Sequence, residues 1–173
     1  MSFQKPLQES CKTIATLYHS PIGDIKLTFS QNTLVGLSFV EADDECRNET
    51  SLQCHKKVVQ WLDDYFCGKV PKTEDLDFSL EGTAFQQKVW QELLKIPYGS
   101  TTNYGHLAHV VAKNMGVEKM SAQAVGNAIG RNPIAIVVPC HRVIGANGTL
   151  TGYAWGIERK KFLLDNERGA RKQ

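Results

Sequence analysis

The residues with the clearest capacity for chemistry lie near the C-terminal end of the chain, in the segment Pro-Cys-His-Arg-Val-Ile at 139–144. A cysteine thiolate is a strong nucleophile, and a neighbouring histidine that accepts the thiol proton is a common way to form it. Proline has no N–H to donate to a sheet, so Pro139 predicts that Cys140 lies at a bend. The segment therefore indicates a cysteine nucleophile that His141 assists across a turn or through a bridging water.

A histidine base usually needs a carboxylate to orient it, and the last predicted helix, 158–168, offers Glu167. Leu163 and Leu164 define an apolar face of that helix, and Glu167 follows them at helical spacing. A carboxylate close to a buried face is costly unless it is paired, so we expect Glu167 to pair with His141. The spacing alone also fits a solvated glutamate beside a cysteine of the core.

Two elements must position the cysteine. The β-branched run 134–138 predicts a buried strand that leads into it. Before this strand, the helix predicted at 121–131 has an alanine or glycine at every second position from 122 to 130, including two glycines that each cost a helix about 1 kcal/mol relative to alanine. Something must therefore approach this helix closely. Both a neighbouring helix and a narrow DNA groove fit the composition.

The second half of the chain reads as a helical DNA-binding domain. Helices are predicted at 84–95, with Thr83 as N-cap, at 104–111 and at 121–131, and their short connections suit a helix-turn-helix. Residues 83–173 carry 12 Lys and Arg against 5 Asp and Glu, whereas residues 1–82 carry 8 against 13. This asymmetry indicates that the C-terminal half meets a polyanion.

The first half reads as β followed by α. Strands are predicted at 13–18, 24–29 and 33–40, with hairpin turns between them, then a loop at 42–51 and a helix at 53–66 that Gly68 ends. We expect two domains, 1–81 and 82–173. The fold class is α+β, with a small antiparallel sheet and a helix in the first domain and helices around the cysteine in the second.

The composition restricts the class of protein further. The five cysteines are odd in number and form no C-x-x-C pair, so we expect free thiols and no metal site. No apolar run is long enough to span a bilayer, and the N-terminal residues lack the apolar core of a signal peptide. A soluble protein is expected, in the cytoplasm, or in the nucleus if the source is eukaryotic.

Together these motifs resemble the O6-alkylguanine-DNA alkyltransferase (methylated-DNA–protein-cysteine methyltransferase) family, in its single-function, bacterial-like form. The resemblance covers about residues 82–168. It rests on the segments at 85–90, 96–99, 132–133, 139–144 and 148–153, which agree with the family in order and spacing. In the first half only the hairpin-then-helix pattern agrees, which in this family belongs to a ribonuclease H-like domain. The C-terminal domain would be a winged helix-turn-helix-like unit.

The resemblance implies a reaction: irreversible transfer of an alkyl group from O6-alkylguanine in DNA to Cys140, with O4-alkylthymine as a second candidate substrate. One protein would repair one lesion as a monomer, without a cofactor, on double-stranded DNA bound through the minor groove. His141 would activate Cys140 through a water, and Glu167 would orient His141. The base, its flanking DNA or the turn that holds them would be contacted by Tyr104, Gln123, Asn132, Arg142, Tyr153 and Lys160.

The sequence departs from the best-known members at three places. Gln123 stands where an arginine often fills the hole left by the flipped base. The loop 113–120 is longer than usual, and Trp155 and Ala135 alter the rim of the pocket. Three other functions remain: a non-catalytic alkyltransferase-like protein that only binds lesions, a helix-turn-helix regulator, and a cysteine hydrolase. The presence of Cys140 argues against the first, and the Cys-His pair has no purpose in the second.

Overall fold

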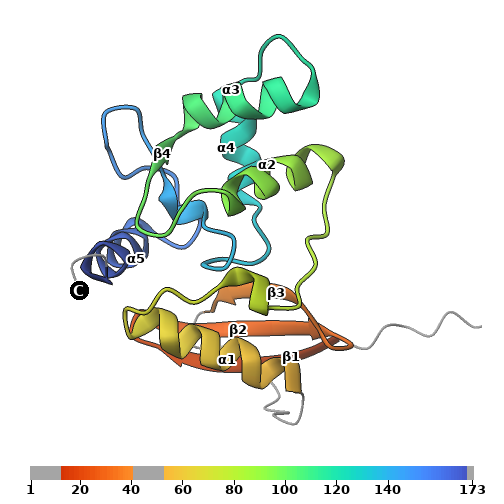
Figure 1. Ribbon diagram of the computed structural model, residues 1–173, viewed down its shortest axis with the longest axis vertical. Coiled ribbons are helices and arrows are strands. Elements are labelled where there is room, and N and C mark those ends of the chain that lie inside the picture. Colours follow the sequence, from red (N-terminus) through yellow and green to blue (C-terminus); the bar gives the residue numbers. More distant parts are fainter. Residues whose placement is uncertain (1–12, 41–52, 171–173) are drawn as a thin grey trace, which may run out of the picture.

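The computed structural model describes residues 13–40 and 53–170 (Figure 1). A small antiparallel sheet and one helix form one end of the molecule, and three helices gather at the other end (Figure 1). The predicted mixed α and β fold, with the sheet in the first half and helices in the second, is confirmed. No helix among the described residues is long and apolar enough to cross a membrane.

The sheet consists of β1 (Thr13–Ser20), β2 (Gly23–Ser30) and β3 (Thr33–Phe39), paired antiparallel in that order. Alternate residues of β2 and β3 are buried, as expected for a sheet with one covered face. The cover is α1 (Gln53–Phe66), whose buried residues Val58, Leu62 and Tyr65 recur at helical spacing. The predicted strands and helix are confirmed within two residues at their ends, whereas the predicted loop 42–51 lies outside the described residues.

The connector after α1 contains a short 3-10 turn (Thr73–Asp75) and the residue Phe78, which bridges Leu34 of β3. The helices α2 (Ala84–Leu94), α3 (Tyr104–Met115) and α4 (Ala122–Gly130) then pack on one another. Thr83 begins α2 with a capping box, as the sequence predicts. The predicted end of the second helix at 111 is wrong by four residues, because the helix continues to Met115 and closes at the left-handed Gly116.

The strand predicted at 134–138 is wrong, although its burial is correct. These five residues are at most 2% exposed, but they form turns, and only Ile134 bridges β3, at Leu37. Ile136 has a φ of 68°, a region that β-branched residues rarely occupy. The amide of Val138 returns to the carbonyl of Ile134, so the chain coils here instead of extending. An apolar run of this kind becomes a strand when it pairs along its length with a neighbouring strand, and here only Ile134 pairs, with Leu37.

The last helix, α5 (Ile157–Ala170), places Lys160, Leu163, Leu164 and Glu167 on one buried face. Before it, a two-residue strand β5 (Val143–Ile144) pairs in parallel with β4 (Thr102–Asn103). This pairing joins the cysteine segment to the start of α3. Helix α5 thus carries two charged residues, two turns apart, towards the turn that contains Cys140.

Candidate active site

The turn that holds Cys140 is built by Pro139. Pro139 has φ −81° and ψ 62°, the values of an inverse γ-turn, and the amide of Cys140 donates to the carbonyl of Val138 at 2.8 Å. A short 3-10 turn, Cys140–Arg142, follows directly. The cysteine therefore lies at a bend, as the proline predicted.

Asn132 braces this bend from the end of α4. Its Nδ2 donates to the carbonyl of Val138 at 2.8 Å and lies 3.2 Å from Sγ of Cys140, while its Oδ1 accepts from the amide of Ile134 at 3.0 Å. One amide side chain thus satisfies both ends of the turn that replaces the predicted strand. Its contact with sulfur also places a hydrogen-bond donor directly on the candidate nucleophile.

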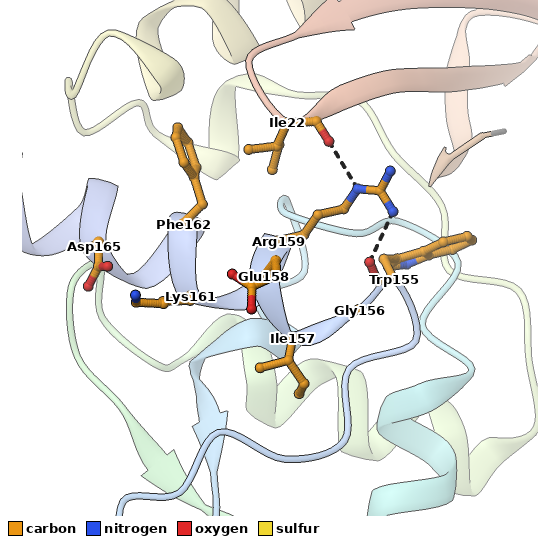
Figure 2. Close-up of a pocket in the computed structure, with 9 residues that line it drawn as sticks. All are labelled: Ile22, Trp155, Gly156, Ile157, Glu158, Arg159, Lys161, Phe162 and Asp165. Atoms are coloured by element: carbon orange, nitrogen blue, oxygen red, sulfur yellow. Dashed lines mark hydrogen bonds between the residues drawn. The ribbon is translucent and has the colours of Figure 1, made fainter. Parts of the chain in front are cut away.

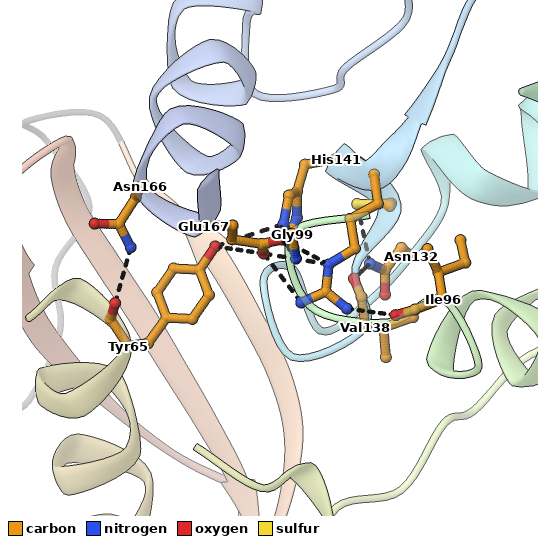
Figure 3. Close-up of polar contacts among 10 residues, drawn as sticks. Tyr65, Ile96, Gly99, Asn132, Val138, His141, Asn166 and Glu167 are labelled. Carbon is orange, nitrogen blue, oxygen red and sulfur yellow. Dashed lines mark hydrogen bonds and ion pairs between the residues drawn. The ribbon is translucent and has the colours of Figure 1, made fainter. Parts of the chain in front are cut away.

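His141 and Glu167 form a fully buried pair behind the cysteine. Nε2 of His141 lies 2.7 Å from Oε1 of Glu167, and neither side chain is exposed (Figure 3). The carboxylate fixes the tautomer: Nε2 carries the proton and donates, which leaves Nδ1 as an acceptor. Nδ1 is buried without a partner among the described residues. The histidine is thus held with a free base lone pair next to Cys140 in the chain.

Arg142 completes the ion pair and does not reach outward. Its Nε donates to Oε2 of Glu167 at 2.9 Å, its second terminal nitrogen to Oε1 at 3.0 Å, and its first to the carbonyl of Ile96 at 2.6 Å. The expectation that Arg142 contacts DNA is therefore at odds with its geometry. A guanidinium with a buried carboxylate partner would have to break that pair to bind phosphate.

Sequence reasoning missed two further donors to the same carboxylate. The hydroxyl of Tyr65, on α1, donates to Oε1 of Glu167 at 2.9 Å, and the amide of Gly99 donates to Oε2 at 2.8 Å (Figure 3). Tyr65 is seen in the sequence only as one member of the apolar stripe of its helix. Gly99 belongs to the Ile-Pro-Tyr-Gly segment, whose turn gave no sign of a backbone donor.

The charges of the site follow from these contacts. Burial alone would raise the pKa of Glu167, but the hydrogen bonds and charges of His141 and Arg142 outweigh it and hold the pKa well below its ordinary value. Burial lowers the pKa of His141 against the opposing effect of Glu167. At neutral pH the site therefore contains a neutral imidazole, a carboxylate and a guanidinium.

The thiol itself is protonated in the DNA-free protein. Burial raises the pKa of Cys140, and the hydrogen bond from Asn132 and the charge of Lys160 offset this only in part. Among the described residues the imidazole of His141 makes no hydrogen bond to Sγ, so its help in removing the thiol proton would come through a bridging water.

Lys160 supports the other side of the turn. Its Nζ donates to the carbonyls of Val143 and Thr151, both at 2.6 Å, and burial lowers its pKa to about 8. The ammonium group therefore ties α5 to β5 and to the loop that follows. Its charge reaches the Cys140 thiol, but the two carbonyls occupy it in this state.

Tyr104 and Tyr153 flank the cysteine on this side. The hydroxyl of Tyr104 donates to the carbonyls of Thr151 and Gly152, at 3.1 and 3.0 Å. A Cβ atom on Gly152 would lie 2.8 Å from that hydroxyl, so only glycine fits there without a shift. The hydroxyl of Tyr153 is buried without a described partner, and both tyrosine pKa values are raised, first by burial and then by Cys140.

The two glycines of α4 are not required by packing within the protein. A Cβ at Gly126 would meet the ring of Tyr104 at 3.7 Å, an ordinary contact, whereas a Cβ at Gly130 would meet nothing within 4 Å. Helix packing thus accounts for neither glycine. Gln123, near the start of α4, is exposed. The exposed side of α4 therefore remains available for a groove in DNA.

A surface cleft of about 680 Å³ lies beside the start of α5 (Figure 2). Arg159 crosses it, donating to the carbonyls of Ile22 and Trp155 at 2.9 and 3.1 Å, and its guanidinium lies over the ring of Phe39. Trp155 lines this cleft and packs beside Phe39, so the sheet supports the loop that carries Trp155. Ala135 is fully buried and donates to Leu37, so the expectation that it shapes a pocket rim is not supported.

Cys140, the buried His141–Glu167 pair and the helical half of the chain define a class of protein in which a cysteine thiol is the acceptor group and the architecture is that of a DNA-binding domain. Family models agree: residues 13–80 match the ribonuclease-like domain of 6-O-methylguanine DNA methyltransferase, and residues 84–169 match its DNA-binding domain. The chain belongs to this family. Among the described residues, no group of three or more His, Cys, Asp or Glu is placed to hold a metal ion.

Individual relatives agree over nearly the whole chain. A methylated-DNA–protein-cysteine methyltransferase of Methanosarcina acetivorans is 44% identical, over 87% of this chain and 96% of its own length. The crystal structure of Mycobacterium tuberculosis O6-methylguanine methyltransferase aligns with a TM-score of 0.79 at 40% identity, over 92% of this chain and 94% of that one. A structure of the same mycobacterial protein in complex with DNA aligns with a TM-score of 0.76 at 42% identity, over 89% and 92%.

Proposed function

We propose that this protein repairs DNA by direct reversal, transferring a methyl or other small alkyl group from O6 of guanine to Sγ of Cys140. The observation that carries the proposal is the fully buried His141–Glu167 pair directly behind Cys140 in the bend made by Pro139. A buried carboxylate–histidine pair next to a cysteine is costly to maintain and serves to move the thiol proton. The membership of the family supplies the substrate class.

The reaction begins when a water relays the Cys140 proton to Nδ1 of His141. The resulting imidazolium faces Glu167, whose charge stabilises it. The thiolate attacks the alkyl carbon in line, so that a C–S bond forms while the C–O6 bond breaks and guanine leaves as an anion that takes up the released proton. The thioether is stable, so each protein acts once. The alkyl carbon and the sulfur need no cofactor for this exchange.

The base must leave the DNA stack to reach Cys140. We infer that α4 enters the minor groove of double-stranded DNA, with Gln123 near the position of the extruded base. Tyr104, Tyr153 and Lys160 would surround the base, and Tyr104 must first release the two loop carbonyls that it now holds. Asn132 would keep the bend in shape. The family-model ranges, which leave 81–83 between them, support a domain division at 81–82.

Intact-mass spectrometry after incubation with an O6-methylguanine oligonucleotide tests this function. One added methyl mass per protein, absent in a Cys140→Ala variant, is the expected result. Peptide mapping should place the methyl on Cys140. Continued turnover would contradict the mechanism and favour a hydrolase, and tight binding without a mass change would favour a protein that only binds the lesion.

A further inference from the structure

The hydroxyl of Tyr65 reaches the His141–Glu167 pair from the first half of the chain. Its oxygen lies 2.9 Å from Oε1 of Glu167 and 3.5 Å from Nε2 of His141 (Figure 3). All three side chains have no exposure to solvent. Tyr65 belongs to α1, the helix that covers the sheet, whereas the pair belongs to the helical half. One phenol therefore connects the sheet-bearing unit to the reaction centre.

The phenol is fixed in place on several sides. Asn166 donates to the backbone carbonyl of Tyr65 at 2.8 Å, so consecutive residues of α5 hold Tyr65 through its backbone and its side chain. The ring stacks on Trp61, with centroids 5.6 Å apart and an interplanar angle of 8°, and meets the edge of Tyr98. Such enclosure leaves the hydroxyl one direction in which to donate, which is towards Glu167.

Tyr65 keeps its phenol proton and donates it to Glu167. Its burial, followed by the charge of Glu167, raises its pKa well above the ordinary value of 10.0, so the phenol keeps its proton. Oε1 of Glu167 then accepts from both Tyr65 and His141. A carboxylate oxygen that is shared with a second donor attracts an imidazolium less strongly, because part of its charge is already stabilised.

We propose that Tyr65 is a positioning residue for alkyl transfer: it aligns Oε1 of Glu167 with Nε2 of His141 and limits how strongly this carboxylate retains a proton on the histidine. The proposal rests on the function proposed above. The role of Tyr65 would be to balance two requirements on the basicity of His141. His141 must accept the thiol proton, but it must remain neutral before the reaction in order to do so.

The variant Tyr65→Phe tests this role, since it removes the hydroxyl and keeps the ring. The single-turnover rate of methyl transfer should fall about fivefold at neutral pH, the value of one hydrogen bond. The acidic limb of the rate profile should also move to higher pH, because Glu167 without the phenol holds a proton on His141 more strongly. DNA affinity, measured in a Cys140→Ala background, should stay unchanged.

Tyr18→Phe is the matched control. Tyr18 also donates its phenol proton to a carboxylate, Asp63 of α1, at 2.8 Å, but away from the cysteine. The Tyr18→Phe variant should have the same methyl-transfer rate and the same acidic limb of the rate profile as the wild type. Substitution of Tyr65 by 3-fluorotyrosine, a stronger donor of nearly the same shape, should move the limb in the opposite direction, and it tests the proposal even if the phenylalanine variant folds poorly.

The outcomes separate the two proposals. Opposite shifts of the acidic limb in the two Tyr65 variants support the positioning role. A wild-type protein that transfers the methyl group, together with Tyr65 variants whose limb does not move, would overturn this role and leave the proposed function intact. A wild-type protein that transfers no methyl group would overturn the function itself.

Discussion

Nε2 of His141 lies 2.7 Å from Oε1 of Glu167, 26 residues later in the chain, and both side chains are fully buried. Arg142 compensates the charge of this buried carboxylate, and Tyr65 and the amide of Gly99 donate further hydrogen bonds to it. His141, which acts as the base, and Arg142, which compensates the charge of Glu167, are therefore neighbours in the sequence. This arrangement makes the chemistry and the stability of the site depend on the same carboxylate.

His141 and Glu167 should act as one unit in catalysis. We expect His141→Gln and Glu167→Gln each to slow methyl transfer by about 10²-fold or more, since each interrupts the removal of the thiol proton. The double variant should lose less than the product of the two effects. Single-turnover rates on a methylated duplex measure this, with Glu158→Gln, an exposed position on α5, as control. Fully multiplicative losses would show that the two residues work separately.

The stability of the protein should fall on acidification. Below pH 6.5 the unfolded chain protonates His141, whereas the buried histidine has a lowered pKa and resists protonation. Below pH 4.5 the unfolded chain also protonates Glu167, whose folded pKa is lowered. In both ranges the unfolded state binds more protons, so the free energy of unfolding decreases as the pH falls. Urea denaturation between pH 7 and about pH 3 measures the slope in both ranges.

Glu167→Gln is the informative variant for this slope. It leaves Arg142 buried without its charge partner, and a loss of about 3 to 5 kcal/mol at neutral pH is expected. Below pH 4.5 the difference from the wild type should narrow, because the unfolded wild-type chain then binds a proton at Glu167, whereas the folded protein, in which the pKa of Glu167 is about 2, does not. A difference that stays constant across the whole pH range would show that the charge of Glu167 does not stabilise the fold.

Cys140 should react slowly with small reagents before DNA binds. Its thiol is buried, and this burial raises its pKa, whereas Cys67 is exposed at the end of α1. Iodoacetamide should therefore modify Cys67 at least about tenfold faster than Cys140, because the thiolate is the reactive form. Peptide mass spectrometry over time measures both rates, with buried Cys54 as an internal reference. Faster labelling of Cys140 would indicate a thiolate in the free protein.

Local patterns in the sequence predicted most elements of this fold. The strands of the sheet and α1 follow from alternation and helical spacing, and Thr83 and Gly68 mark helix ends by capping chemistry. The strand predicted at 134–138 was wrong, because a buried apolar run has the same sequence pattern whether it forms a strand or a coil. The side chain of Asn132, six residues before Val138, stabilises the coil, and that contact has no local signature.

Residue type and sequence spacing were sufficient to predict the central residues of the site. Cys140, His141 and Glu167 were chosen as reactive types, and the structure brings the last two into contact. The resemblance implies a contact of Arg142 with the base or DNA, whereas the structure pairs its guanidinium with the buried carboxylate of Glu167. Tyr65 lies 102 residues from Glu167, and only the packing of α1 against α5 connects them.

The Trp155 ring should restrict the size of the alkyl group. Trp155 is half-buried, and its loop is tied to the sheet by Arg159, so the ring cannot easily swing away. O6-benzylguanine as free base should react slowly with the wild type, and Trp155→Gly should raise that rate more than the rate on methylated DNA. Phe162 lines the same cleft, so the variant Phe162→Ala is the control. An equal increase on both substrates would contradict a steric role.

Gln123 should be a weak substitute for the extruded base. It is exposed near the start of α4, whose other exposed residues are Ala122, Asn127 and Gly130. Glutamine can hydrogen-bond to an orphaned cytosine, but it lacks the planar cation with which arginine stacks on bases and contacts phosphates. Because unpairing a base costs a few kcal/mol in a duplex and much less in a single strand, a poor substitute penalises duplex repair more.

Two substitutions at this position test the consequence. Gln123→Arg should raise the ratio of the duplex rate to the single-strand rate, and Gln123→Ala should lower it. Gln91→Arg, at an exposed position of α2, controls for the added positive charge, and all rates must be measured at one salt concentration because phosphate contacts are salt-sensitive. If Gln91→Arg raises the ratio as much as Gln123→Arg does, general electrostatic attraction explains the effect. If the ratio is the same in all four proteins, Gln123 is only a solvated residue of its helix.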